Sequence, residues 1–173
     1  TLRAEILTAA VALARKAGVR TLTTMEFLVD EAAGRFVFME ANPRLQVEHT
    51  VTEEITGIDL VQTQIRLAAG ETLAAIGLSQ DGVQTRGVAV QLRVNMERMA
   101  ADGGATPAGG TLAAFDPPGG AGIRVETFGY AGYRTATSFD SLLAKVIAHA
   151  PAGGWREAAG KAFRALAEFR IEG

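Results

Sequence analysis

Residues 38–49 read Phe38-Met39-Glu40-Ala41-Asn42-Pro43-Arg44-Leu45-Gln46-Val47-Glu48-His49. In extended backbone, alternate side chains point to opposite faces, so one face from Glu40 to Glu48 would carry only polar groups. These groups are two carboxylates, two amides and a guanidinium, which can hold a metal cation at one end and a small planar anion at the other. A half-exposed strand with an ordinary solvated face is the alternative that these residues leave open.

The length of this stretch predicts a bend. A straight strand from Glu40 to Glu48 would span roughly 26 Å, which is too long for one small site. Pro43 lacks a backbone N–H and restricts the conformation of Asn42 before it. We therefore expect the chain to bend near Pro43.

Composition excludes several classes of protein. The chain has 173 residues, a net charge of −2 and no cysteine. It therefore has neither a basic field for nucleic acid nor thiols for disulfides, metal ligation or nucleophilic catalysis. No apolar run reaches the length of about 18 residues that a membrane span needs, and the first residues do not have the order of a signal peptide. We expect a cytoplasmic protein without nucleic-acid or membrane partners.

Before the stretch, the pattern predicts a helix over 2–16 and then a β-hairpin. Its strands are expected at 21–30 and 35–40, joined by a turn at 31–34. In such a hairpin Glu26 can lie beside Glu40, and two adjacent carboxylates need a shared proton or a cation between them. The alternative is that Glu26 simply faces water on an edge strand.

After the stretch, we expect a short helix that stops at Gly57 and a second helix capped by Asp59 that ends at Gly70. Residues 88–95 alternate between apolar and polar side chains, which predicts a half-buried strand. Arg93 lies on its polar face, and from the isolated sequence it would be a plain surface residue.

The rest of the chain reads as strands, loops and one helix. Residues 100–110 suggest a loop, and 111–115 and 122–128 suggest strands, while 139–147 fits either a helix or a strand. The last helix is expected to pack through one apolar side, made of Trp155, Ala159, Ala162, Phe163 and Leu166.

The stretch resembles the signature E-x-N-x-R-[LI]-Q-V-E-H-x-V-T-E of biotin carboxylases. These are the ATP-grasp components of acetyl-, propionyl- and other acyl-CoA carboxylases, pyruvate carboxylase and urea carboxylase. Residues 86–95 are similar to the family's R-G-H-A-[IV]-E-x-R-[IV]-N, and 117–133 and 139–147 resemble its C-terminal domain, with a strand at 139–147. This sequence departs from the usual residues at Thr50, which replaces proline, at Val88, which replaces histidine, and at Gln91, which replaces glutamate.

The resemblance implies an α+β fold. The end of an ATP-grasp domain, an antiparallel sheet with helices, is expected at 1–50. Linking helices are expected at 51–82 and the biotin carboxylase C-terminal domain, a mixed and mainly antiparallel sheet with helices, at 83–173. No phosphate-binding loop is found in the sequence, so we expect a C-terminal fragment that is inactive on its own. Asp140 and Lys145 are expected to be structural ion-pairing residues.

The activity that the resemblance implies is ATP-dependent carboxylation of biotin with bicarbonate, through carboxyphosphate. Its cofactors are ATP, Mg²⁺ or Mn²⁺, and biotin on a carrier domain. Glu26 and Glu40 match the metal ligands, with Asn42 assisting. Glu48 is expected to be the general base and Arg93 to stabilise the biotin oxygen. The matching bicarbonate residues are Arg44, Gln46, Val47 and Glu48, and the ATP contacts are Leu28 and Ile171.

The implied partners are bicarbonate, a biotin carboxyl carrier, a carboxyltransferase and a second copy in a homodimer. Two alternatives remain open at this point. One is a non-catalytic module for dimer contacts or carrier docking. The other is a different ATP-grasp ligase, such as a carbamoyl-phosphate synthetase domain, against which the Gln46-Val47-Glu48-His49 run counts.

Overall fold

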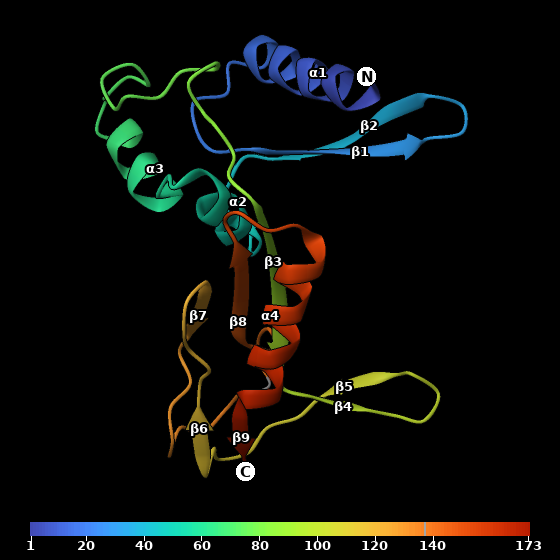
Figure 1. The fold of residues 1–173 in the computed structure, drawn as a ribbon, viewed down its shortest axis with the longest axis vertical. Coiled ribbons are helices and arrows are strands. Elements are labelled where there is room, and N and C mark those ends of the chain that lie inside the picture. Colours follow the sequence, from blue (N-terminus) through green and yellow to red (C-terminus); the bar gives the residue numbers. More distant parts are fainter. Residues whose placement is uncertain (137) are drawn as a thin grey trace. The chain divides into compact units, whose positions relative to one another are not determined.

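A computed structural model describes residues 1–136 and 138–173, and the chain divides into two compact units (Figure 1). The first unit comprises Thr1–His49 and Ile58–Gln84, and the second comprises Thr50–Gly57 and Thr85–Gly173. All strand pairs among the described residues are antiparallel. This arrangement confirms the expected α+β class.

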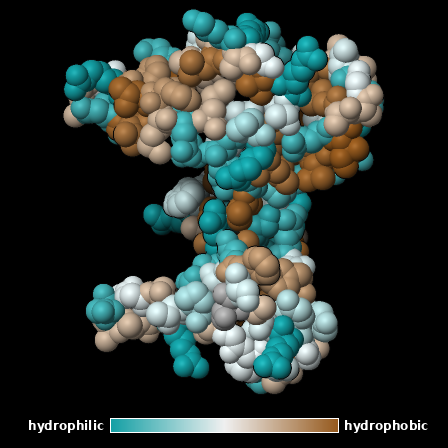
Figure 2. Space-filling model, turned by 180° about the vertical axis from the view of Figure 1, so that it is seen from behind, coloured by the Kyte–Doolittle hydropathy of each residue, from teal (hydrophilic) through white to brown (hydrophobic). Residues whose placement is uncertain are grey.

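The first unit contains the predicted helix and hairpin. Its elements are α1 (Leu2–Lys16), β1 (Thr24–Asp30), β2 (Arg35–Asn42) and α3 (Leu60–Ala68). Asp59 caps α3 as expected, because its side chain accepts a hydrogen bond from the backbone N–H of Gln62 at 2.7 Å. The hairpin exposes several large apolar side chains, among them Leu28 and Phe38, and hydrophobic residues are visible at the surface in Figure 2.

The second unit is built on a three-stranded sheet of order β3-β8-β7, against which α4 packs (Figure 1). It also contains all of α2 but its first residue. Its elements are α2 (His49–Thr56), β3 (Val88–Asn95), β4 (Glu97–Met99), β5 (Ala105–Pro107), β6 (Ala114–Asp116), β7 (Ile123–Thr127), β8 (Leu142–Ala150), α4 (Trp155–Glu168) and β9 (Arg170–Glu172). The strand β8 is the core of this unit, since Val146 and Ile147 are fully buried.

The packed face of α4 differs from the predicted one. Trp155 and Phe163 are 67% and 76% exposed, whereas Ala158, Ala162 and Ala165 are buried against the sheet. Of the predicted stripe, Ala162 is correctly placed in the interface. The physical reason is close packing, because β8 itself presents small residues that let a helix with alanines approach.

Two further expectations needed correction. The segment 100–110 is not only a loop, because β5 pairs with β4 in a short hairpin. In 111–115, only 114–115 belong to a strand, β6, whose partner is β9, while Thr111 forms an isolated bridge with Arg134. Such pairings between short segments depend on distant partners, which local patterns do not specify.

Candidate functional site

The hairpin brings Glu26 and Glu40 together as direct cross-strand partners. The side-chain nitrogen Nδ2 of Asn42 donates hydrogen bonds to Oε1 of Glu26 at 3.0 Å and to Oε1 of Glu40 at 2.9 Å. Both carboxylates therefore converge on one point at the end of the hairpin. The prediction that Glu26 lies beside Glu40 is confirmed.

This cluster of Glu26, Glu40 and Asn42 has the chemistry of a site for a hard cation. Magnesium and manganese prefer carboxylate and carbonyl oxygens as ligands. The amide nitrogen now lies where the two carboxylates meet, and a half-turn of the amide about its terminal torsion would present Oδ1 there instead. The residues present therefore fit a divalent cation.

The strand β2 ends at Asn42, and residues 43–48 form a turn that leads into α2. The Arg44 N–H donates to the Asn42 carbonyl at 2.8 Å, and the His49 N–H donates to the Gln46 carbonyl at 3.2 Å. The bend expected at Pro43 is thus confirmed. The single polar face holds only as far as Asn42, because the chain beyond Pro43 is no longer extended.

Within this turn, hereafter the 43–48 loop, the predicted bicarbonate residues differ in exposure. Arg44 and Glu48 are exposed, whereas Gln46 and Val47 are half-buried. Arg44 donates a hydrogen bond from Nη1 to the Leu45 carbonyl at 3.3 Å. A guanidinium and a carboxylate are therefore both presented to solvent within five residues of chain.

Gln46 carries an unsatisfied acceptor. Its Oε1 atom is buried and has no hydrogen-bond partner among residues 1–136 and 138–173. Leaving such an atom unpaired costs about 1–3 kcal/mol, so an unexplained case calls for a reason.

Arg93 is exposed on β3, where it lies opposite Lys145 of β8. Lys145 is 8% exposed and pairs with Glu126 of β7 at 2.7 Å, which confirms its predicted structural role. Asp140 was predicted to pair with a cation. In the structure its Oδ1 accepts a local hydrogen bond from the Leu142 N–H at 2.8 Å.

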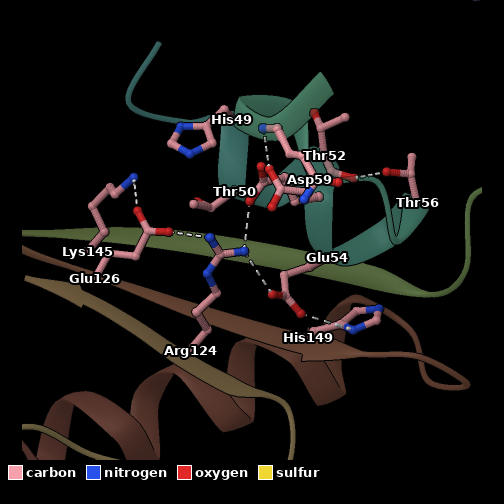
Figure 3. A network of polar contacts seen from close by, with 12 residues as sticks. His49, Thr50, Thr52, Glu54, Thr56, Asp59, Arg124, Glu126, Lys145 and His149 are labelled. Atoms are coloured by element: carbon pink, nitrogen blue, oxygen red, sulfur yellow. Dashed lines mark hydrogen bonds and ion pairs between the residues drawn. The ribbon is translucent and has the colours of Figure 1, made fainter. Parts of the chain in front are cut away.

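A cluster of charges around Arg124 was not predicted (Figure 3). Arg124 extends from β7 toward α2, where Nη1 contacts Glu53 at 2.8 Å and Glu54 at 3.4 Å, and Nη2 contacts Glu126 of its own strand. Partial burial lowers the pKa of Arg124, but the hydrogen bonds to Glu53 and Glu126 outweigh it, so the pKa is raised. The sequence offered only the alternation of Arg124 and Glu126 as a signal, and not the partners on α2.

The predicted ATP contacts lie in different units. Leu28 is on β1 in the first unit and is 59% exposed, and Ile171 is on β9 in the second unit and is also exposed. The metal cluster and the 43–48 loop likewise belong to the first unit, whereas Arg93 belongs to the second. Each group is therefore defined within its own unit.

Two family models match nearly the whole chain. Residues 1–76 match "Carbamoyl-phosphate synthase L chain, ATP binding domain", and residues 91–173 match "Biotin carboxylase C-terminal domain". The second match separates the chain from a carbamoyl-phosphate synthetase, because it covers the segment that carries Arg93.

Known proteins agree with this division. The chain is 48% identical to pyruvate carboxylase 1 of Caenorhabditis elegans and 40% identical to biotin carboxylase 1 of Bacillus subtilis, with 99% of the chain covered in each case. It spans only 14% of the first relative and 37% of the second.

A solved structure is similar to this one as well. It is the biotin carboxylase domain dimer of 2-oxoglutarate carboxylase from Hydrogenobacter thermophilus, in complex with MgADP, ADP and bicarbonate. The TM-score is 0.87 at 41% identity, over 96% of this chain and 35% of that one. The chain therefore belongs to the biotin carboxylase family of ATP-dependent carboxylases, of which it carries the end of the ATP-binding domain and a C-terminal domain.

Proposed function

We propose that a longer protein containing this chain carboxylates carrier-linked biotin with bicarbonate, at the expense of ATP. The observation that supports this most directly is the order of groups along one hairpin end. A cluster of two carboxylates and an amide is followed at once by a loop that presents a guanidinium and a carboxylate. Cation and bicarbonate would then be held by consecutive parts of the same chain.

Glu26, Glu40 and Asn42 are proposed to hold Mg²⁺ or Mn²⁺. When bound, the cation would neutralise negative charge on the phosphates of ATP. The part that the chain itself contributes is convergence, because cross-strand pairing fixes Glu26 and Glu40 on one side of the hairpin. Leu28 and Ile171 are proposed to contact the nucleotide through their exposed apolar side chains.

The 43–48 loop is proposed to bind bicarbonate. The planar guanidinium of Arg44 suits a planar anion, which it can contact through two parallel hydrogen bonds. Gln46 and the Val47 backbone N–H would help to orient the anion, so that the single bicarbonate proton remains for the base. The exposed carboxylate of Glu48 would then take the bicarbonate proton as general base.

Arg93 is proposed to donate hydrogen bonds to the biotin oxygen that gains negative charge when the ureido nitrogen loses its proton. The carboxyl group would leave on a biotin carrier, for use by a carboxyltransferase that chooses the final acceptor. We further propose that the protein forms a homodimer, because the similar 2-oxoglutarate carboxylase domain is a dimer. We also propose that it is cytoplasmic, since a chain without cysteine is compatible with a reducing compartment.

Glu48→Gln in the longer protein tests this function. Bicarbonate-dependent ATP cleavage in the presence of biotin should fall by at least about 10²-fold, because a positioned base typically contributes that much. Glu31→Gln is the matched control, since Glu31 is an exposed carboxylate in the β1–β2 turn. Activity that survives Glu48→Gln at the level of the control would refute the assignment.

A further inference from the structure

Two side chains at which this sequence departs from the biotin carboxylase pattern are bonded to each other. The Thr50 hydroxyl donates a hydrogen bond to Oε1 of Gln91, 41 residues away in sequence. Thr50 is fully buried, and both residues belong to the second unit. The usual proline and glutamate at these positions cannot form this bond, because proline has no hydroxyl. The two departures are therefore physically linked.

The bond joins the first turn of α2 to the strand that carries Arg93. Gln91 precedes Arg93 by two positions on β3, so both side chains leave the same face of the sheet, about 7 Å apart along the strand. Thr50 is the second residue of α2. A hydroxyl that is fully buried and donates to β3 fixes the helix start on this strand.

The surrounding charges favour a neutral residue at position 91. The sheet face and α2 together carry three cations and three carboxylates: Arg93, Arg124 and Lys145, and Glu53, Glu54 and Glu126. A carboxylate at position 91 would add a fourth anion to this set and would lie within reach of Arg93. A neutral amide avoids this, but its half-buried oxygen then needs a donor, and Thr50 supplies it.

We propose that Thr50 and Gln91 are a matched pair of positioning residues, which hold β3 against the first turn of α2 so that Arg93 meets biotin in a fixed orientation. This inference rests on the proposed role of Arg93 in binding biotin. Thr50 and Gln91 act through Arg93 and do not touch the substrate themselves.

The first experiment removes the hydroxyl in the longer protein. Thr50→Val keeps the shape of the side chain and should raise KM for free biotin about 5–10-fold in the ATP cleavage assay, with KM for ATP unchanged, which corresponds to the loss of one hydrogen bond. Thr50→Ser retains the hydroxyl, so its KM for biotin should equal that of the wild type. Thr63→Val is the control, because the Thr63 hydroxyl donates to the Asp59 carbonyl in the cap region of its own helix.

The second experiment tests whether the pair is matched. Thr50→Pro strands the Gln91 amide, and Gln91→Glu draws Arg93 toward a new carboxylate, so each alone should raise KM for biotin. The double variant should be less impaired than the product of the two single effects, because both changes act on the same hydrogen bond and proline is accepted in the first turn of a helix. Multiplicative effects of the two changes would overturn the proposal.

The outcomes separate this inference from the proposed function. If Glu48→Gln abolishes activity and Thr50→Val leaves KM for biotin unchanged, the function stands and the matched pair is refuted. If the wild-type protein cleaves no ATP in response to biotin, both are refuted. Should Thr50→Val fail to fold, Thr50→Ala and the double variant test the pair through the same comparison of KM for biotin with KM for ATP.

Discussion

Replacing Arg124 by methionine would remove the centre of the charge cluster that joins α2 to β7. Methionine keeps a similar length of apolar side chain, so the change is mainly one of charge and hydrogen bonding. Glu53 would be most affected, because its side chain is only 9% exposed and its contact with Arg124, at 2.8 Å, would be lost. Glu126 would keep Lys145 as a partner.

The expected loss of stability follows from these exposures. Removing one partner of a fully buried ion pair costs about 3–5 kcal/mol. Arg124 is 35% exposed, and Glu54 and Glu126 are 25% and 32% exposed, so water screens part of the interaction. We therefore expect a loss of about 2 kcal/mol in the free energy of unfolding, which lowers Tm by about 4–8 °C for a chain of this size.

Thermal unfolding followed by circular dichroism at pH 7 and low salt measures this change. Arg164→Met is the control, because Arg164 and its partner Glu168 are about half exposed and 3.9 Å apart, and its loss should cost no more than about 0.5 kcal/mol. Adding Glu53→Gln to Arg124→Met should recover most of the lost stability. If Arg124→Met behaves like the control, or Glu53→Gln recovers nothing, the argument from a stranded carboxylate is wrong.

Two further predictions concern pH and metal. Partial burial raises the pKa of Glu126, but the hydrogen bonds from Lys145 and Arg124 outweigh it, so its folded pKa is lowered. Its contribution is thus present above the unfolded value of about 4.3 and lost as pH falls through the folded pKa. The wild type should exceed Glu126→Gln in urea midpoint at pH 7, the gap should narrow as pH falls below the unfolded pKa, and a constant gap would contradict this. Asn42→Ala should weaken Mn²⁺ binding, measured by electron paramagnetic resonance, by about 10-fold or more relative to Glu31→Gln, because Asn42 holds both carboxylates; equal binding would refute it.

Local patterns were sufficient for the existence of the hairpin and for the helix ends around it. The turn at 31–34 sets the register from Asp30 opposite Arg35 to Phe27 opposite Phe38, and a β-bulge between Glu26 and Phe27, which the pattern does not predict, then brings Glu26 opposite Glu40. Gly57 ends α2 and Asp59 begins α3 through ordinary backbone and capping chemistry. These features depend on residues within about 20 positions of one another, so a local sequence pattern can detect them.

The face of α4 could not be predicted in the same way. Ranking by side-chain size favours Trp155 and Phe163 as the packed residues, yet the helix packs through alanines. What decides the matter is the surface it meets, and β8 presents small residues at Ala144 and Ala148 that permit close approach. A hydrophobic pattern measures which residues avoid water, but not how near two elements lie.

The Arg124 cluster shows the same limit for charges. Arg124 and Glu54 are 70 residues apart, so no local rule pairs them. Alternating charges on β7 and two adjacent acids on α2 are each typical of a solvated surface. Only the register of β7 on β8, together with the Thr50–Gln91 bond that seats α2 on β3, brings them into contact.

These contacts explain how exposed functional groups can be held in place. Arg44, Glu48 and Arg93, which we propose to meet the substrates, are exposed, and exposure leaves few packing contacts to fix them. In the second unit, order comes instead from residues beneath the face: Thr50 and Glu53 on one turn of α2 bond to Gln91 and Arg124 on two outer strands of the sheet. Substitutions in this turn of α2 should therefore alter the placement of the Arg93 strand before they alter the fold.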